Sequence, residues 1–283
     1  MAQERSFAAS AVTLNYLDHE SPRPEPLVML HGGAWRWQEF LSLIPTLATH
    51  RHVYALDLRG NGRSGWTPGA YRLRDFTRDI LEFLDHHCAA PAVLAGHSLG
   101  GAVALMAAAR RPDKVAGLII EDVPLNLDTY RRFVDASGGM YRHWLGLKRA
   151  AASADALALM LAEAHRDYPR LTSQWLLFFA ACLWQLDPTF FDPLLNDFDD
   201  FISGYDPKAI LPRLACKLLF LHGEPGLQTV ATPAETAWLR QNVPAARCVL
   251  IDGVGHLLHL EDQGQAPVLA EMRGFLEALR PPA

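Results

Sequence analysis

The 283-residue sequence has few charged residues, and this shortage already excludes several classes of protein. Charged residues make up 20% of the chain and hydrophobic residues 50%, a balance that excludes a disordered chain and predicts a globular protein with a large core. With 26 Lys and Arg against 31 Asp and Glu, the formal charge of -5 gives no general attraction to nucleic acid or to an anionic membrane surface. We therefore expect neither as a partner.

Cysteine and long apolar runs are also scarce. The four cysteines are scattered, with no Cys-x-x-Cys pair and no clustered histidine, which argues against a zinc site and a disulfide framework and predicts free, mostly buried thiols: Cys88, Cys182, Cys216 and Cys248. The longest apolar runs, residues 99–109 and 175–184, fall short of the roughly 18 residues that a membrane-spanning helix needs. The N-terminal residues lack the pattern of a signal peptide, so a cytoplasmic location is the default expectation.

What the sequence does contain is an alternation of short apolar segments with segments of helical periodicity, typical of parallel strands joined by crossover helices. The strand-like segments of the first part are residues 26–30, 52–58, 92–95 and 115–120, and each ends in glycine or polar residues. The same pattern returns after Pro212, with strands over 217–221 and 248–251 and helices over 233–242 and 266–279. We therefore predict an α/β fold with a doubly wound, mostly parallel sheet, in which ligands bind at the carboxyl ends of the strands.

Residues 125–206 interrupt this alternation, because they are helix-like and rich in aromatic side chains. We predict that residues 1–124 and 207–283 form one core and that residues 125–206 form a helical cap inserted into it. Residues 175–184 carry more apolar surface than one helix stripe can hide, so part of this run is expected to line a pocket. Trp35 and Trp184 are the expected lining residues, and the substrate is expected to be apolar or aromatic.

The segment Gly96-His97-Ser98-Leu99-Gly100-Gly101 fits the pattern G-x-S-x-G and lies between a predicted strand and a predicted helix over 101–110. A nucleophilic serine needs such a sharp strand-to-helix turn, because the turn exposes its oxygen and small neighbours avoid clashes. The amino end of the helix favours a developing oxyanion, with the Leu99 amide as the expected donor. The alternative is an ordinary glycine-rich turn, which would not need the His-Ser pair.

With these flanks the sequence resembles the α/β-hydrolase superfamily, in its serine-nucleophile branch with a helical cap, over nearly the whole chain outside the insert. His31-Gly32-Gly33-Ala34-Trp35 looks like the family's oxyanion loop, where the N–H of Gly33 would supply a second donor and Gly32 would be a further residue of the oxyanion hole. Residues 57–64 resemble the family's D-x-R-G-x-G-x-S turn, which we interpret as structural. Serine at the turn argues against the dehalogenase and epoxide hydrolase members, which use an aspartate.

The resemblance places the base after the last strand, where Gly255-His256 is similar to the family's terminal Gly-His segment. An imidazole suits this role because its unperturbed pKa lies near neutrality, so it can take a proton from serine and return it to the leaving group. The nearest rival, His259, has no glycine before it.

The acid departs from the family pattern. Most members carry it in a G-x-x-D segment after the strand before the last one, and here that segment reads Gly223-Glu224-Pro225-Gly226. Some members supply the acid from the end of the strand that corresponds to residues 115–120, and Glu121-Asp122-Val123-Pro124 resembles the arrangement in the zearalenone lactonases. We favour Asp122, with Glu224 as the alternative, and expect Glu121 to point to the opposite side of the strand.

The sequence thus predicts a serine hydrolase that cleaves a carboxylic ester or lactone, zearalenone-type macrolactones included, through an acyl-enzyme and without a metal or organic cofactor. Two alternatives stay open. One is hydrolysis of a carbon-carbon bond in an aromatic ring-cleavage product, and the other is a hydrolase-like ligand receptor. The physiological substrate and the oligomeric state are left undecided.

Overall fold

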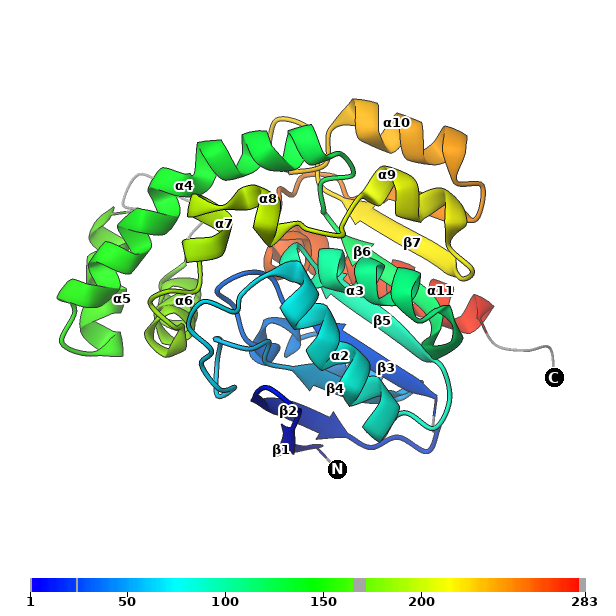
Figure 1. The fold of residues 1–283 in the computed structure, drawn as a ribbon, viewed down its shortest axis with the longest axis horizontal. Coiled ribbons are helices and arrows are strands. Elements are labelled where there is room, and N and C mark those ends of the chain that lie inside the picture. Colours follow the sequence, from blue (N-terminus) through cyan, green and yellow to red (C-terminus); the bar gives the residue numbers. More distant parts are fainter. Residues whose placement is uncertain (1, 24, 165–171, 280–283) are drawn as a thin grey trace.

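An eight-stranded sheet forms the centre of the computed structural model, which describes residues 2–23, 25–164 and 172–279 (Figure 1). Its spatial order is β1-β2-β4-β3-β5-β6-β7-β8. The first two pairings, β1 with β2 and β2 with β4, are antiparallel, and all the others are parallel. The strands are β1 (Ala2–Ala8), β2 (Thr13–His19), β3 (Pro26–Leu30), β4 (His52–Leu56), β5 (Ala92–His97), β6 (Val115–Glu121), β7 (Lys217–His222) and β8 (Ala246–Leu250). The predicted fold class is confirmed.

Helices cover both faces of the sheet, because successive strand residues point to opposite sides. In β3, Val28 and Leu30 pack against α2 (Leu73–His87) and α3 (Leu99–Arg110), whereas Leu27 and Met29 pack on the other face. That other face is covered by α1 (Ile44–Leu47), the 3-10 turn Trp37–Phe40 and α11 (Asp262–Ala278). α10 (Pro233–Asn242) lies on the same face as α2 and α3. Burial on both sides explains why the central strands are continuously apolar in sequence.

The N-terminal hairpin of β1 and β2 was not predicted. β1 is largely exposed, and its sequence Ala-Gln-Glu-Arg-Ser-Phe-Ala has no apolar run that would mark it as a strand. It is held at the sheet edge by antiparallel pairing with β2 over the full length of both strands, from Ala2 opposite His19 to Ala8 opposite Thr13. An exposed edge strand stabilised by backbone pairing leaves little hydrophobic signal in a sequence.

The chain between β6 and β7 holds a group of helices that gathers to one side of the sheet (Figure 1). We call α4 (Leu127–Ala150), α5 (Ala154–Ala164), α6 (Ser173–Gln185), α7 (Asp192–Asn196) and α8 (Phe198–Phe201) the insert helices. The short α9 (Pro207–Ile210) leads back to β7. The apolar sides of α4 to α6 pack into the same hydrophobic cluster as α2 and α3, so the insert helices continue the core of the sheet.

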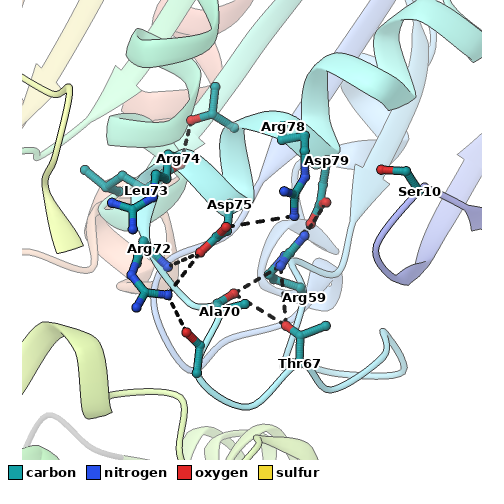
Figure 2. Close-up of polar contacts among 12 residues, drawn as sticks. Ser10, Arg59, Thr67, Ala70, Arg72, Leu73, Arg74, Asp75, Arg78 and Asp79 are labelled. Carbon is teal, nitrogen blue, oxygen red and sulfur yellow. Dashed lines mark hydrogen bonds and ion pairs between the residues drawn. The ribbon is translucent and has the colours of Figure 1, made fainter. Parts of the chain in front are cut away.

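Buried polar contacts fix the loop between β4 and α2 (Figure 2). Arg59 is fully buried and makes a bidentate ion pair with Asp79 of α2, with Nε 2.6 Å and Nη2 2.5 Å from the two carboxylate oxygens. At the start of α2, Arg72 and Arg74 both bind Asp200, which ties α8 to α2. The structural role that we predicted for the Arg of the D-x-R-G turn agrees with these contacts.

The aspartate of the same turn holds three backbone segments together. Asp57 is buried and accepts hydrogen bonds from the N–H groups of Trp37 and Arg63 at 2.7 and 2.9 Å and from the Asn15 side chain at 2.8 Å. Gly62 has a φ of +54° and would place a Cβ 2.2 Å from Asp57, so this turn needs glycine there. The four cysteines are free, and two of them, Cys88 and Cys182, are buried. Among the described residues, no helix is both long enough and apolar enough to span a membrane.

Candidate active site

Ser98 sits at the junction of β5 and α3 in a strained turn. Its φ is +50°, a region that residues other than glycine rarely adopt. The turn is sharp because its glycines allow close approach: a Cβ on Gly96 would lie 2.4 Å from the Gly100 backbone, and a Cβ on Gly100 would lie 2.0 Å from the carbonyl oxygen of Leu30. The glycines of the G-x-S-x-G pattern therefore let α3 pack directly on the strands, and Ser98 lines the cavity described below.

Asp122 follows β6 and also has a positive φ, +46°. Its carboxylate is fully buried and accepts four hydrogen bonds. Oδ1 accepts from the Thr229 hydroxyl at 2.6 Å and from the Ala231 N–H at 3.0 Å, and Oδ2 accepts from the Val230 N–H at 2.8 Å. The fourth donor is Nδ1 of His256, 2.7 Å from Oδ2. Burial opposes ionisation of this carboxyl, but the bonds from His256, Thr229 and Val230 outweigh it and hold the pKa of Asp122 below its usual value.

His256 links the other two side chains. It lies in the loop between β8 and the 3-10 turn Leu258–Leu260, and its Nε2 is 3.1 Å from Oγ of Ser98. An ionised carboxylate can only accept, so Nδ1 carries the proton that faces Asp122 and Nε2 is left to accept from the Ser98 hydroxyl. The result is an ordered chain of hydrogen bonds from Ser98 through His256 to Asp122.

The structure separates the alternatives that the sequence left open for the acid and the base. Glu224 does not reach His256, because its Oε2 accepts the N–H of Gly253 at 2.8 Å and holds the loop after β8. His259, the rival base, is buried with its Nδ1 2.7 Å from Oε2 of Glu121. Glu121 therefore points away from Asp122, on the other side of the strand end, as expected.

Two of the three residues predicted for the oxyanion hole line the cavity, and the third, Gly32, has its N–H bonded elsewhere. Leu99 begins α3, where backbone N–H groups have no partner within the helix, and it lines the cavity together with Gly33. Gly32 is not an available donor, because its N–H is bonded to Oε2 of Glu39 at 2.9 Å. This part of the prediction was wrong, and the reason is a carboxylate seven residues further on that the loop sequence alone does not place.

A cavity of about 610 Å³ opens above Ser98 and His256, between the sheet and the insert helices. Aromatic side chains form much of its wall, with contributions from the loop after β3 and from α4 and α6: Trp35, Phe133, Tyr141, Trp144, Trp175 and Phe179. Within the described part of the chain, no Asp, Glu, Lys or Arg side chain lines this cavity. The indole Nε1 of Trp144 is buried without a hydrogen-bond partner among the described residues.

Of the two predicted lining residues, Trp35 lines the cavity and Trp184 does not. Trp35 packs face to face on Phe178, with ring centroids 5.7 Å apart, and is buried. Trp184 is 39% exposed and lies nine residues after Trp175 in α6, about half a helical turn away from the side that faces the cavity. The residues of this helix that do line the cavity are Trp175 and Phe179, one turn apart.

Sequence reasoning missed the donors to Asp122, residues 229–231. They lie in the loop after β7, the place where most family members carry the acid. The start of α10, which Thr232 caps with a capping box to Glu235, was predicted correctly, but the contacts of the loop before it were not. Two of the three bonds come from backbone N–H groups, which have no residue signature, so only the folded loop reveals them.

Comparisons with known proteins agree with this architecture. A family model described as "Alpha/beta hydrolase family" matches residues 27–270. The chain is 36% identical over 254 residues to the dihydrolipoyllysine-residue acetyltransferase component of the acetoin cleaving system of Pseudomonas putida, covering 89% of this chain and 63% of that protein. It therefore spans less than two thirds of that relative.

Two solved structures are similar over almost their full length. One is described as Est816, an N-acyl homoserine lactone degrading enzyme, with a TM-score of 0.74 and 23% identity, covering 96% of this chain and 100% of that chain. The other is E-2-(acetamidomethylene)succinate hydrolase, with a TM-score of 0.73 and 20% identity, covering 98% of this chain and 100% of that chain. At these identities the similarity establishes the fold.

Proposed function

This chain belongs to the alpha/beta hydrolase family, and on that premise we propose that it hydrolyses a carboxylic ester or lactone of an apolar or aromatic substrate through an acyl-enzyme on Ser98. One observation carries the proposal. The hydrogen-bond chain Ser98–His256–Asp122 ends at a serine that lines an aromatic cavity. The zearalenone-type macrolactones suggested by the position of Asp122 belong to this substrate class.

In the first half of the reaction, Oγ of Ser98 attacks the carbonyl carbon while its proton moves to Nε2 of His256. The negative charge that develops on the carbonyl oxygen is stabilised by the N–H groups of Leu99 and Gly33. Asp122 stabilises the imidazolium that forms, through the 2.7 Å bond to Nδ1. His256 then gives its proton to the departing alkoxide, and the acyl group stays on Ser98.

In the second half, water replaces the alcohol. His256 takes a proton from the water, the resulting hydroxide attacks the acyl carbon, and the proton returns to Oγ of Ser98 as the carboxylic acid leaves. With a lactone, the alcohol and the acid belong to one molecule. After the first half of the reaction the ring-opened chain is therefore still bound to Ser98, and the second half takes place in the same cavity.

The cavity wall favours an uncharged substrate. An anionic substrate would lose its hydration without gaining a cationic partner, since no Lys or Arg among the described residues lines the cavity.

The decisive experiment compares hydrolysis of aryl esters, alkyl esters and an aromatic macrolactone by the wild type, Ser98→Ala and Ser137→Ala. Ser137 also lines the cavity but lies outside the hydrogen-bond chain, so it is the matched control. We expect Ser98→Ala to lose on the order of 10³-fold or more in kcat and Ser137→Ala to stay within about tenfold of the wild type.

Three results would contradict the proposal. Turnover of a vinylogous diketone in place of every ester would assign the protein to carbon-carbon hydrolysis. Tight binding of an aromatic lactone without turnover would assign it to ligand reception. Ester hydrolysis that survives Ser98→Ala would exclude an acyl-enzyme on this serine, and mass spectrometry after a fluorophosphonate probe checks that point directly.

A further inference from the structure

Two buried pairs of histidine and glutamate lie beside the candidate triad, and the proposed reaction does not use either. Nδ1 of His97 is 2.5 Å from Oε1 of Glu39, and Nδ1 of His259 is 2.7 Å from Oε2 of Glu121. All four side chains are at most 2% exposed, and none lines the cavity. The pairs touch each other, since Nε2 of His259 is 3.8 Å from Oε1 of Glu39.

Three of the four residues come from the same segments as the candidate triad. His97 precedes Ser98 at the end of β5, and Glu121 precedes Asp122 at the end of β6, directly opposite His97 in the sheet register. His259 follows His256 by three residues. Because side chains alternate along a strand, His97 and Glu121 point to the opposite side from Ser98 and Asp122. They therefore form a second layer of side chains behind the candidate triad.

The Glu39–His97 pair makes one further contact at each end. Oε2 of Glu39 accepts the N–H of Gly32, at 2.9 Å, in the loop that carries the proposed oxyanion donor Gly33. Nε2 of His97 is 3.0 Å from the backbone carbonyl oxygen of His256. An unbroken path of hydrogen bonds therefore joins the oxyanion loop to the backbone of the proposed base.

This path requires a charged imidazole. A carboxylate and a carbonyl oxygen are both acceptors, so both nitrogens of His97 must carry a proton. Burial opposes this charge, but the adjacent Glu39 and the nearby Glu121 raise the pKa of His97 to about 9. The other titratable groups that face His97 are His31, His256 and His259. If His97 lost a proton, it would have one N–H for two acceptors and one of the two loops would be released.

We propose that the buried Glu39–His97 ion pair fixes the position of the oxyanion loop relative to the backbone of His256. The inference rests on the proposed function, because it assigns the pair to the alignment of groups that act on the substrate. Neither residue touches the substrate, so both are positioning residues. Misplacing reacting groups by about 1 Å can cost on the order of 100-fold in rate.

The test follows the rate at which a fluorophosphonate modifies Ser98 and the kcat/KM for an aryl ester, both measured from pH 6 to 10.5 in the wild type and in Glu39→Gln. The variant keeps the shape of the side chain but removes the charge that holds His97 protonated. We expect both rates to fall above about pH 9 in the wild type, which gives each pH profile an alkaline limb. In Glu39→Gln this limb should lie at least about one pH unit lower, with kcat reduced roughly tenfold or more and KM within about threefold.

Asp79→Asn is the matched control for a broken buried ion pair, because the Arg59–Asp79 pair is equally buried but belongs to the structural turn at α2 (Figure 2). We expect it to lower the midpoint of thermal unfolding, as Glu39→Gln does, without moving the alkaline limb. An alkaline limb that is the same in Glu39→Gln as in the wild type would overturn the proposal.

A measurement on the wild type alone keeps the proposal testable if Glu39→Gln does not fold. In protein with ¹⁵N-labelled histidine, we expect both ring nitrogens of His97 to be protonated at pH 7.5, and a neutral ring would overturn the proposal. Failure of the proposed function can be distinguished from failure of this inference. The first would leave Ser98 unreactive in the wild type, whereas the ¹⁵N measurement tests the protonation of His97 independently.

Discussion

At the scale of the residue, Ser98 and Asp122 share an uncommon backbone conformation. Both have a positive φ, +50° and +46°, which costs on the order of 1–3 kcal/mol for residues other than glycine. Each lies at the end of a strand, and β5 and β6 are neighbours in the sheet. The two strained turns aim the serine and the carboxylate at the same imidazole, so the strain is tied to the geometry of the site.

The acid can be tested by two matched carboxylate substitutions. We expect Asp122→Asn to lower kcat by on the order of 10⁴-fold, because the amide no longer fixes the tautomer of His256 or stabilises its charge. Glu224→Gln should keep kcat within about tenfold, since its carboxylate holds the Gly253 N–H and not the imidazole. Steady-state kinetics on an aryl ester provide the comparison, and the opposite ranking would assign the acid to Glu224.

The residues that sequence reasoning placed and those it did not differ in a physical way. Ser98, His256 and Asp122 were predicted because the segments around them resemble family motifs, although Glu224 stayed open as the alternative acid. Gly32 was misassigned and the donors at residues 229–231 were missed because their contributions are backbone N–H groups, whose partners depend on how distant loops meet. Glu39 accepts the hydrogen bond from the Gly32 N–H, but nothing in the sequence distinguishes it from an ordinary charged residue.

At the scale of the element, α3 and α4 use glycine in opposite ways. Gly100 is in contact with the strands, where a Cβ would lie 2.0 Å from the Leu30 carbonyl oxygen, whereas a Cβ on Gly139 in α4 would meet nothing within 4 Å. We expect Gly100→Ala to prevent folding or to lower the unfolding free energy by several kcal/mol. Gly139→Ala should raise that free energy by up to about 1 kcal/mol through helix propensity. Urea denaturation measures both, and equal effects would contradict this account.

Helix α6 gives a second element-scale prediction. Trp175 lines the cavity and Trp184 is on the other side of the helix. We therefore expect Trp175→Ala to raise KM for aromatic esters by roughly tenfold, through loss of apolar contact, while Trp184→Ala leaves KM within about twofold of the wild type. Measuring both variants on one substrate settles the assignment, and a larger effect at Trp184 would place the binding surface on the outer side of α6.

At the scale of the whole molecule, the alternation of strands and helices made the architecture predictable from sequence. The central strands are buried on both faces, so they appear as apolar runs; β3 and α10 begin and end where they were predicted. β1 was missed because it is largely exposed, whereas β2 was missed although it is buried. The division into a core and a cap stays a prediction.

The stability of the whole molecule should depend on alkaline pH through His97. Its pKa is raised from about 6.5 to about 9, so its contribution to stability is complete below about pH 6.5 and is lost as the pH rises through about 9. We expect the unfolding free energy of the wild type to fall by on the order of 3 kcal/mol between pH 6.5 and 10, and the Glu39→Gln variant to lack most of this fall. Urea titrations across this range would show a parallel decline in both proteins if another group were responsible.

The position of Asp122 also sets the order in which the site is completed during synthesis. Ser98 and Asp122 are both made before the insert, whereas His256 follows Asp122 by 134 residues. At translation rates of about 5–20 residues per second, roughly 7–27 s pass between the two. Throughout that interval the nascent chain has a serine and an acid with no base between them, so the catalytic apparatus that we propose can act only after the last strand has been added to the sheet.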